Sequence, residues 1–450
     1  MSVSIRLPDE SGSENKTEST AKHVADSKNN GLKNNAVLGE SNQMFVDVPA
    51  PLQDGEQVGV ANRDSAEIRN ARANSRGAGR LVGLDATRGL AVIGMYLQHF
   101  GSNETISAIV SGNTTLLFVL CGGISYSIMA RRMMDQGAES TTFRARMLAR
   151  AVFVDLIGYL LILLNTPYGV ILPAYAAMFV LALVLVHRSI RVLVTTAVAL
   201  TVVAPPLMIL GMSVLGGGDV LSDIAGGPMS ALAIAPAFVA GMAIGRLDLT
   251  KVRTALSLAG GGGLTLAVGK MLSAFVIPGL SRSFDAWLIG LQGTVSAVPT
   301  MPEPNAIWPL NTEPPLWNML LWTSPHSAST FQTLIGLGGS FLVLGLVCLV
   351  PKKNSVVLLP FAAVGRVALT MYAVQFVVIW SLELAGIEYG LGGIPYGDFL
   401  VAAATLVTGW LIARLPFGPI ESLMRHFDRA FSASRTSPYS SKRSSSTTAF

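Results

Sequence analysis

Long apolar segments between residues 80 and 425 constrain the fold of this chain more than any other feature of its sequence. A helix needs about 20 apolar residues to cross the hydrocarbon core of a bilayer. The segments lack the polar face that a helix of a soluble protein presents to water. Ten of them are long enough, each with bounds uncertain by a few residues: 84–101, 113–130, 146–164, 169–187, 192–212, 228–246, 254–277, 328–350, 358–385 and 397–415. We therefore expect an all-α fold, a polytopic membrane bundle of about ten transmembrane helices.

Charged residues are scarce and unevenly placed. They make up 13% of the 450 residues, about half of the share of about 25% in ordinary soluble domains. Both flanks of the apolar region are polar, so we expect disordered cytoplasmic tails at 1–79 and 426–450 around a transmembrane domain at 80–425. The first residues lack the apolar core of a cleavable signal peptide.

Basic residues fall on alternate connections between the predicted helices. One set of connections carries nearly all of them: Arg131, Arg132, Arg144, Arg146, Arg188, Arg191, Arg246, Lys251, Arg253, Lys352 and Lys353. The other set carries only Arg282: 102–112, 165–168, 213–227, 278–327 and 386–396. Because Lys and Arg collect on the cytoplasmic side, the first set and both termini are expected there. The positions of these basic residues therefore argue against a nucleic-acid partner, which a net charge of +5 could otherwise suggest, and we expect a multi-pass protein of the plasma (inner) membrane.

Asp85, Arg88 and His99 form a polar stripe on the first predicted helix. Asp85 and Arg88 are i,i+3 neighbours and can pair on one face. His99 follows Arg88 by 11 residues, which places the two on nearly the same face and about 16 Å apart along the helix. A charge at mid-membrane costs about 2.5–3.5 kcal/mol on insertion scales. We predict that the stripe faces a common cavity with a functional role; the alternative for His99 is a packing role.

The connection 278–327 and the segment after it carry a second group of candidates. His326, in segment 324–327 (SPHS), is predicted at the depth of His99, and two imidazoles there can share an active site. Capping of the next helix is the alternative for His326. Asp285 and Trp287 are candidates for sugar binding, although Trp also marks membrane interfaces.

The stretch 80–99 (RLVGLDATRGLAVIGMYLQH) resembles the first helix of the transmembrane acyltransferase superfamily. This superfamily includes the acyltransferase-3 O-acetyltransferases and the lysosomal heparan-alpha-glucosaminide N-acetyltransferase. Arg88 and His99 match the arginine and histidine of the acyltransferase-3 pattern. Further stretches resemble the bacterial YeiB-like branch: 118–127 (FVLCGGISYS), 171–179 (ILPAYAAMF), 241–249 (GMAIGRLDL), 324–327 (SPHS), 365–375 (GRVALTMYAVQ) and 418–421 (GPIE).

The resemblance, which covers about residues 80–425, implies acyl transfer from a cytosolic acyl-CoA. The CoA phosphates would meet basic residues: Arg88, Arg146, Arg150 or Arg246. The thioester would reach His99, which would act as a general base or carry the acyl group transiently. Asp85 would hold Arg88, and Asp155 is a further member of that pair. Tyr372 and Gln375 would line the path, with packing as the alternative for Gln375.

We therefore expect an acyltransferase that moves an acetyl or other short acyl group from acyl-CoA to an extracytoplasmic cell-envelope glycan or glycolipid. The expected catalytic residues are His99, His326 and Asp85, and the expected acceptor-binding residues are Asp285, Trp287, Tyr372 and Gln375. No metal is expected. The lipid bilayer is the expected partner, and a homodimer is left open. The alternatives are a proton-coupled transporter or lipid flippase with the same polar path, and a non-catalytic scaffold.

Overall fold

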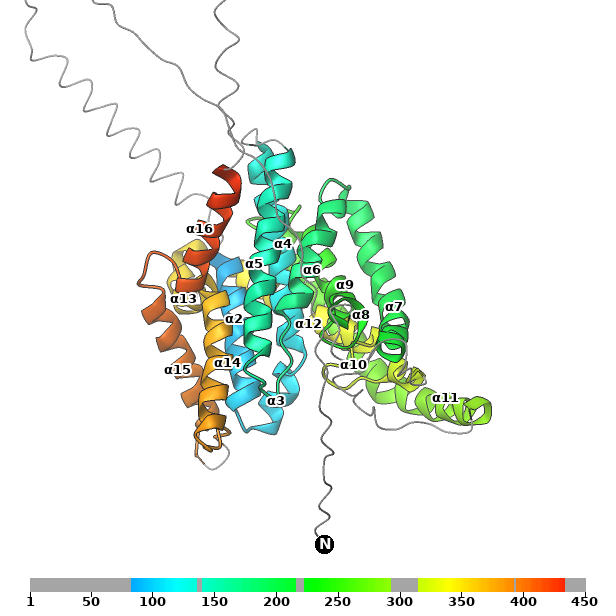
Figure 1. Cartoon of the computed structure of the whole chain (residues 1–450). Coiled ribbons are helices and arrows are strands. Elements are labelled where there is room, and N and C mark those ends of the chain that lie inside the picture. The colour runs from blue at the N-terminus through cyan, green and yellow to red at the C-terminus, as the bar shows by residue number, and fades with distance from the viewer. Residues whose placement is uncertain (1–81, 136–139, 216–221, 293–314, 392–393, 434–450) are drawn as a thin grey trace, which may run out of the picture. The chain divides into compact units, whose positions relative to one another are not determined.

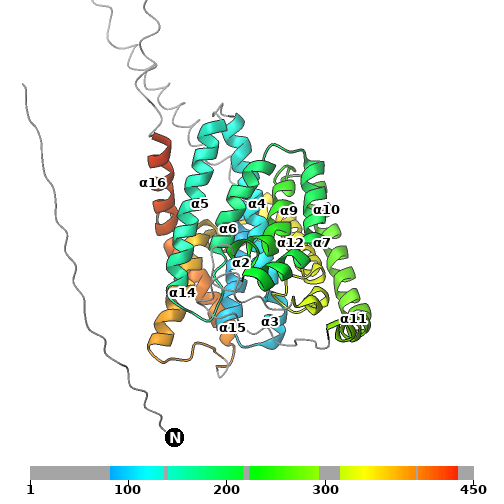
Figure 2. The same ribbon diagram turned by 45° about the vertical axis from the view of Figure 1, so that its right-hand side comes forward.

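In the computed structural model, the described residues are 82–135, 140–215, 222–292, 315–391 and 394–433. Every regular element within these ranges is a helix (Figures 1 and 2), as the sequence predicts. The predicted tail at 1–79 and residues 434–450 of the other tail lie outside the described residues. Residues 293–314 of the predicted long loop do so as well.

Most of the helices are connected by short turns. In chain order, the α-helices are α2 (Val82–Phe100), α3 (Glu104–Val110), α4 (Asn113–Asp135), α5 (Ser140–Ile162), α6 (Leu172–Leu185), α7 (Ile190–Leu215), α8 (Ser222–Ala225), α9 (Ala231–Ile244), α10 (Val252–Met271), α11 (Ile277–Gln292), α12 (Thr330–Leu349), α13 (Leu359–Arg366), α14 (Ala368–Leu384), α15 (Gly397–Ile412) and α16 (Pro419–Ala433). A π-helix η1 (Leu272–Val276) joins α10 to α11. Two 3-10 helices, η2 (Trp317–Leu321) and η3 (Lys352–Leu358), precede α12 and α13.

Several helices are long and apolar enough to cross a membrane, which indicates a membrane protein. Among the described residues there are four: Glu104–Asp135, Ile190–Val214, Val252–Leu291 and Thr330–Leu349. The pair Lys353–Arg366 and Ala368–Leu384, bent by 65°, is a fifth if it counts as one span. The apolar helices α6, α9 and α15 are shorter. The structure thus supports four or five spans by length and composition, and the expected ten are not established.

Several predicted boundaries differ in the structure, and the short helices α3 and α8 lie within the expected connections 102–112 and 213–227. Residues 278–292, expected in a loop, form α11, and the wide turn of η1 stands just before Pro278, whose ring and missing N–H interrupt regular α-helical bonding. The expected helix 358–385 is broken at Val367. The expected tail boundary after residue 425 falls inside α16, which continues to Ala433 because its apolar residues recur at helical spacing.

Helix α2 packs against the helices α3, α4, α12, α13, α14 and α15, and it also contacts the 3-10 helix η3. Several of its side chains are completely buried, including Ala86, Ala91 and Val92. The polar residues Asp85, Arg88 and His99 therefore project from a helix that is enclosed by protein over most of its circumference.

Two glycines allow α2 and α13 to touch backbone to backbone. A Cβ on Gly89 would collide with the carbonyl of Phe361, and a Cβ on Gly365 would collide with the carbonyl of Asp85. Small residues at such contacts let membrane helices approach closely. This contact brings the end of α13 next to Arg88.

We predict that Gly365→Ala destabilises the bundle by about 1–3 kcal/mol, because the added methyl must push α13 away from α2. Thermal unfolding in detergent measures the effect. The matched control is Gly339→Ala on α12, where a Cβ meets nothing within 4 Å. Equal melting temperatures for the two variants would contradict the close contact.

Candidate functional site

The break between α13 and α14 is the point from which the candidate site is built. Val367 has φ −117° and ψ 32°, outside the helical range, and α14 begins at the next residue in a new direction. A broken helix exposes carbonyls at one end and N–H groups at the other. At each end, a charged side chain from another helix binds some of these groups.

Arg88 binds the carbonyl end of the break. Its Nη1 donates to the carbonyl of Gly365 at 3.3 Å and lies 3.4 Å from Asp85 Oδ1. Its Nη2 donates to Ser125 Oγ on α4, and that hydroxyl donates to the carbonyl of Cys121 at 2.7 Å. The pair predicted between Asp85 and Arg88 is therefore present, and a positive charge faces the negative end of the α13 dipole.

Glu421 of α16 binds the N–H end of the break. Its Oε1 accepts from the backbone N–H groups of Leu369 at 2.8 Å and Thr370 at 3.1 Å. The hydroxyl of Thr370 donates to Oε2 at 2.5 Å. A carboxylate on free N–H groups at the start of a helix complements the helix dipole. The segment 418–421 thus has a structural role, as the cap of α14 from a distant helix.

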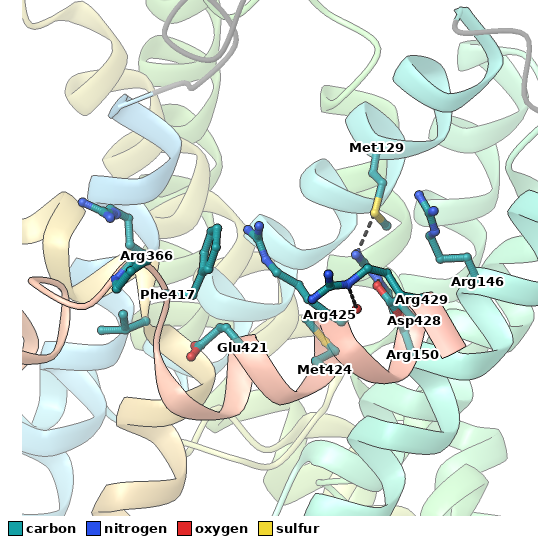
Figure 3. Close-up of a pocket in the computed structure, with 12 residues that line it drawn as sticks. Met129, Arg146, Arg150, Arg366, Phe417, Glu421, Met424, Arg425, Asp428 and Arg429 are labelled. Atoms are coloured by element: carbon teal, nitrogen blue, oxygen red, sulfur yellow. Dashed lines mark hydrogen bonds and ion pairs between the residues drawn. The ribbon is translucent and has the colours of Figure 1, made fainter. Parts of the chain in front are cut away.

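A cavity of about 640 Å³ lies beside this cap, and we call it the basic cavity (Figure 3). Five arginines line it, from α5, α13 and α16: Arg146, Arg150, Arg366, Arg425 and Arg429. Arg150 Nε pairs with Asp428 Oδ2 at 2.7 Å. Within the described part of the chain, Arg146, Arg366 and Arg429 form no ion pair with a carboxylate. The cavity therefore presents an excess of positive charge suited to an anion.

A second cavity of about 250 Å³ contains Arg88, and we call it the Arg88 cavity. Its lining includes Ser125 and Tyr175. It shares five lining residues with the basic cavity: Met129, Arg150, Arg366, Glu421 and Met424. The two spaces are therefore neighbours with common walls, and Arg88 lies at the inner end of the pair.

A third cavity, of about 140 Å³, holds both candidate histidines, and we call it the imidazole cavity. Its lining includes three of the predicted acceptor-binding or catalytic partners: His326, Tyr372 and Gln375. The His99 ring stacks on Tyr168, with ring centroids 3.9 Å apart. The sequence prediction that His99 and His326 meet at one depth is therefore matched by their positions.

Gln375 is the hydrogen-bond partner of His99 Nδ1. Its Nε2 donates to His99 Nδ1, and its Oε1 is buried with no hydrogen-bond partner in the described residues. An amide turned by 180° would instead accept from a protonated Nδ1 through Oε1. In that orientation His99 Nε2 keeps a free lone pair, as a general base requires.

His326 is held in an unusual backbone conformation. Its φ is 60°, and Ala328 two residues later has φ 51°. Residues other than glycine rarely adopt this left-handed region, and such conformations are concentrated at functional sites. Gln98 Nε2 lies 2.9 Å from His326 Nε2. Burial lowers the pKa of this loop histidine, so its ring is neutral at pH 7 and can accept the Gln98 amide proton.

Arg88 and His99 do not share a cavity, contrary to the sequence expectation. Phe118 and Leu172 line the Arg88 cavity, Tyr372 lines the imidazole cavity, and the two cavities share no lining residue. The Tyr372 hydroxyl accepts from the backbone N–H of Ile171 at 3.0 Å, and the rings of Phe118 and Tyr372 are 6.3 Å apart. We call the rings of Phe118 and Tyr372 the aromatic layer. The spacing of Arg88 and His99 on one helix therefore did not predict that the two residues line separate cavities.

Three predicted site residues lie away from these cavities. Arg246 donates to the carbonyl of Val186 at the end of α6, so it links α9 to α6 and does not line the basic cavity. Asp285 and Trp287 lie on α11, and neither lines the imidazole cavity. The Trp287 side chain is 58% exposed. The sequence placed Arg246 in a basic loop and the other two residues in a long connection. Neither assignment indicates which side chains these residues contact.

Asp85 holds Arg88 as expected but lies apart from His99, and Asp155 lies elsewhere than expected. Asp85 lies near Arg88 and not near His99, so it positions the arginine and does not touch the imidazole cavity. Asp155 on α5 does not join that pair. Its electrostatic neighbour is Asp223 of α8, which accepts from Tyr159 at 2.6 Å.

Several residues of the site were not predicted. Gln98 precedes His99 on α2, and Tyr168 lies in the turn before α6. No sequence pattern distinguished either residue as part of a site. Arg366, Arg425 and Arg429 line the basic cavity. The strong amphipathic pattern of α16 is the one sequence feature that points to the last two.

Comparison with known proteins gives one match. Residues 305–429 match a family described as a protein of unknown function, DUF418. The matched region contains His326, the break at Val367, Gln375 and most of α16. No curated protein and no solved structure matches the chain.

We predict that Glu421→Ala costs about 0.5–2 kcal/mol, because the N–H groups of Leu369 and Thr370 lose their acceptor. Glu421→Gln, which keeps one amide oxygen, loses less. The control is Glu383→Ala, at the opposite end of α14, where a carboxylate does not cap the helix. Unfolding temperatures compare the variants, and a larger loss for the Glu383 variant would contradict the cap.

Proposed function

We propose that this chain is a multi-pass membrane acyltransferase that moves an acetyl or other short acyl group from cytosolic acyl-CoA to an extracytoplasmic cell-envelope glycan or glycolipid. In this proposal the protein lies in the plasma (inner) membrane with both termini in the cytoplasm. The observation that carries it is a succession of cavities, arginine-rich at one end and holding His99 and His326 at the other.

The basic cavity is the proposed site for the CoA phosphates. Arg146, Arg366 and Arg429 offer guanidinium groups that form no ion pair with a carboxylate of the described residues. Guanidinium groups match phosphate oxygens in geometry and charge. These residues replace Arg246, which was expected from sequence to meet a phosphate and donates to a backbone carbonyl instead.

The imidazole cavity is the proposed site of transfer. As a general base, His99 Nε2 removes the proton of the acceptor hydroxyl or amine while the acceptor atom attacks the thioester carbonyl. The new C–O or C–N bond forms, the C–S bond breaks, and the departing sulfur takes the proton from His99. The route through an acyl-histidine uses the same ring as nucleophile, and both remain open.

The aromatic layer must open for this reaction. The pantetheine arm would pass from the Arg88 cavity to His99, a helical distance of about 16 Å. Tyr372 closes that passage through its bond to Ile171. A layer that closes again around the bound arm would exclude water from the thioester.

We predict that His99→Ala lowers acyl transfer by about 10²- to 10⁴-fold and leaves CoA binding unchanged, because His99 is remote from the basic cavity. Transfer is measured as free thiol released from acetyl-CoA in the presence of envelope lipids. The control is His187→Ala, an exposed histidine between α6 and α7. Unchanged turnover in the His99 variant would exclude both proposed roles of His99.

We predict that Arg146→Gln weakens CoA binding by about 10- to 100-fold, the effect of losing a hydrogen bond to a charged group. Arg144→Gln is the matched control, since Arg144 is exposed on the same helix and does not line the basic cavity. Equilibrium binding of radiolabelled CoA to the purified protein is the measurement. Equal losses in the two variants would indicate nonspecific attraction instead of a phosphate site.

A proton-coupled transporter or lipid flippase is the second candidate, and the broken helix favours it. Membrane transporters use discontinuous helices whose free ends meet charged groups near the substrate. The break at Val367, with Arg88 and Glu421 at its two ends, has this form. Substrate flux into vesicles that depends on pH and is lost in His99→Ala, without any thiol release, would favour the transporter.

A further inference from the structure

A groove of about 340 Å³ lies between α2, α13 and α15, and we call it the lateral groove. It is a different space from the three cavities described above, although it shares Arg366 with the basic cavity and with the Arg88 cavity. Its lining is Val82, Asp85, Leu359, Ala362, Ala363, Arg366, Trp410, Ala413 and Arg414. The acyl-transfer proposal gives it no role.

Two guanidinium groups from different helices are the charged features of the lateral groove. Arg366 ends α13, and Arg414 follows α15. The Arg414 guanidinium lies over the Trp410 ring, 3.7 Å from its centroid. Neither arginine forms an ion pair with any residue that the structure describes, and both side chains are exposed. The one carboxylate in the lining, Asp85, is paired with Arg88.

The surface around these arginines is apolar. Leu359 of α13 is 52% exposed, and Trp410 is 47% exposed. One turn earlier in α15, Val407 is 55% exposed, and Leu411 beside Trp410 is 50% exposed. In a membrane helix such residues contact lipid chains, and tryptophan occurs where chains meet headgroups. The lateral groove thus has cations at one level and an apolar wall beside them.

We propose that the lateral groove binds an anionic phospholipid, with its phosphate between Arg366 and Arg414 and an acyl chain along Val407 and Leu411. Charge complementarity supports this occupant, because two guanidinium groups without carboxylate partners face a space large enough for a headgroup. Basic pockets between membrane helices are known to take anionic headgroups. A soluble phosphate would gain nothing from the apolar wall.

The test uses the purified full chain in a neutral detergent and native mass spectrometry. Phosphatidylglycerol and phosphatidylcholine with identical acyl chains are titrated separately, and glycerol 3-phosphate serves as the soluble probe. The variants are Arg414→Gln and Arg366→Gln, alone and together. The matched control is Arg253→Gln, which removes an exposed arginine from the first turn of α10.

We expect phosphatidylglycerol to bind in preference to phosphatidylcholine, and the double variant to bind it about 30-fold more weakly, the effect of removing two basic residues from a membrane surface. Arg253→Gln should bind as the wild type does. Equal binding of the two lipids, an equal loss in the control, or displacement of phosphatidylglycerol by glycerol 3-phosphate would overturn the proposal. Arg414→Glu, at an exposed position outside the helices, provides a variant that keeps the fold, and unchanged lipid preference there would also overturn it.

Discussion

The rest of the site depends on how two charged side chains bind the ends of the break between α13 and α14. Arg88 satisfies the carbonyl end and Glu421 satisfies the N–H end, so one cation and one carboxylate hold open a helix that would otherwise continue. Because Arg88 belongs to α2 and Glu421 to α16, the break also ties the first described helix to the last. The basic cavity and the Arg88 cavity both lie against this junction, with Glu421 in the wall that they share.

The sequence predicted those parts of the site that follow from spacing along one helix. Asp85, Arg88 and His99 lie on one side of α2 as helical periodicity requires, and Tyr372 and Gln375, three residues apart, line the same cavity. Predictions that depended on position between helices were less successful. Arg246 follows α9 and donates to a carbonyl at the end of α6. Asp285 and Trp287 lie on α11, outside the cavities described above. Hydropathy indicates membrane helices but carries no information about where Phe118 and Leu172 will meet Tyr372.

The aromatic layer divides the polar interior into two parts of different character. On one side, guanidinium groups line spaces with room for a phosphate-bearing ligand. On the other, imidazoles and amides of Gln98 and Gln375 line a smaller and less charged space. Because a buried charge is costly without a partner, this separation keeps the arginines together near their carbonyl and carboxylate neighbours and leaves the histidines with neutral ones.

The two possible orientations of the Gln375 amide correspond to the two tautomers of the neutral His99 ring. The oxygen and nitrogen of an amide are nearly equal in size, so a half turn of this group exchanges acceptor for donor without displacing any neighbour. After such a rotation the ring proton would lie on the other nitrogen of His99, and this exchange would need no movement of α2 or α14. In such a pair, the orientation of the Gln375 amide would decide which nitrogen of the His99 ring carries the proton. The nitrogen chemical shifts of the ring would distinguish the two states.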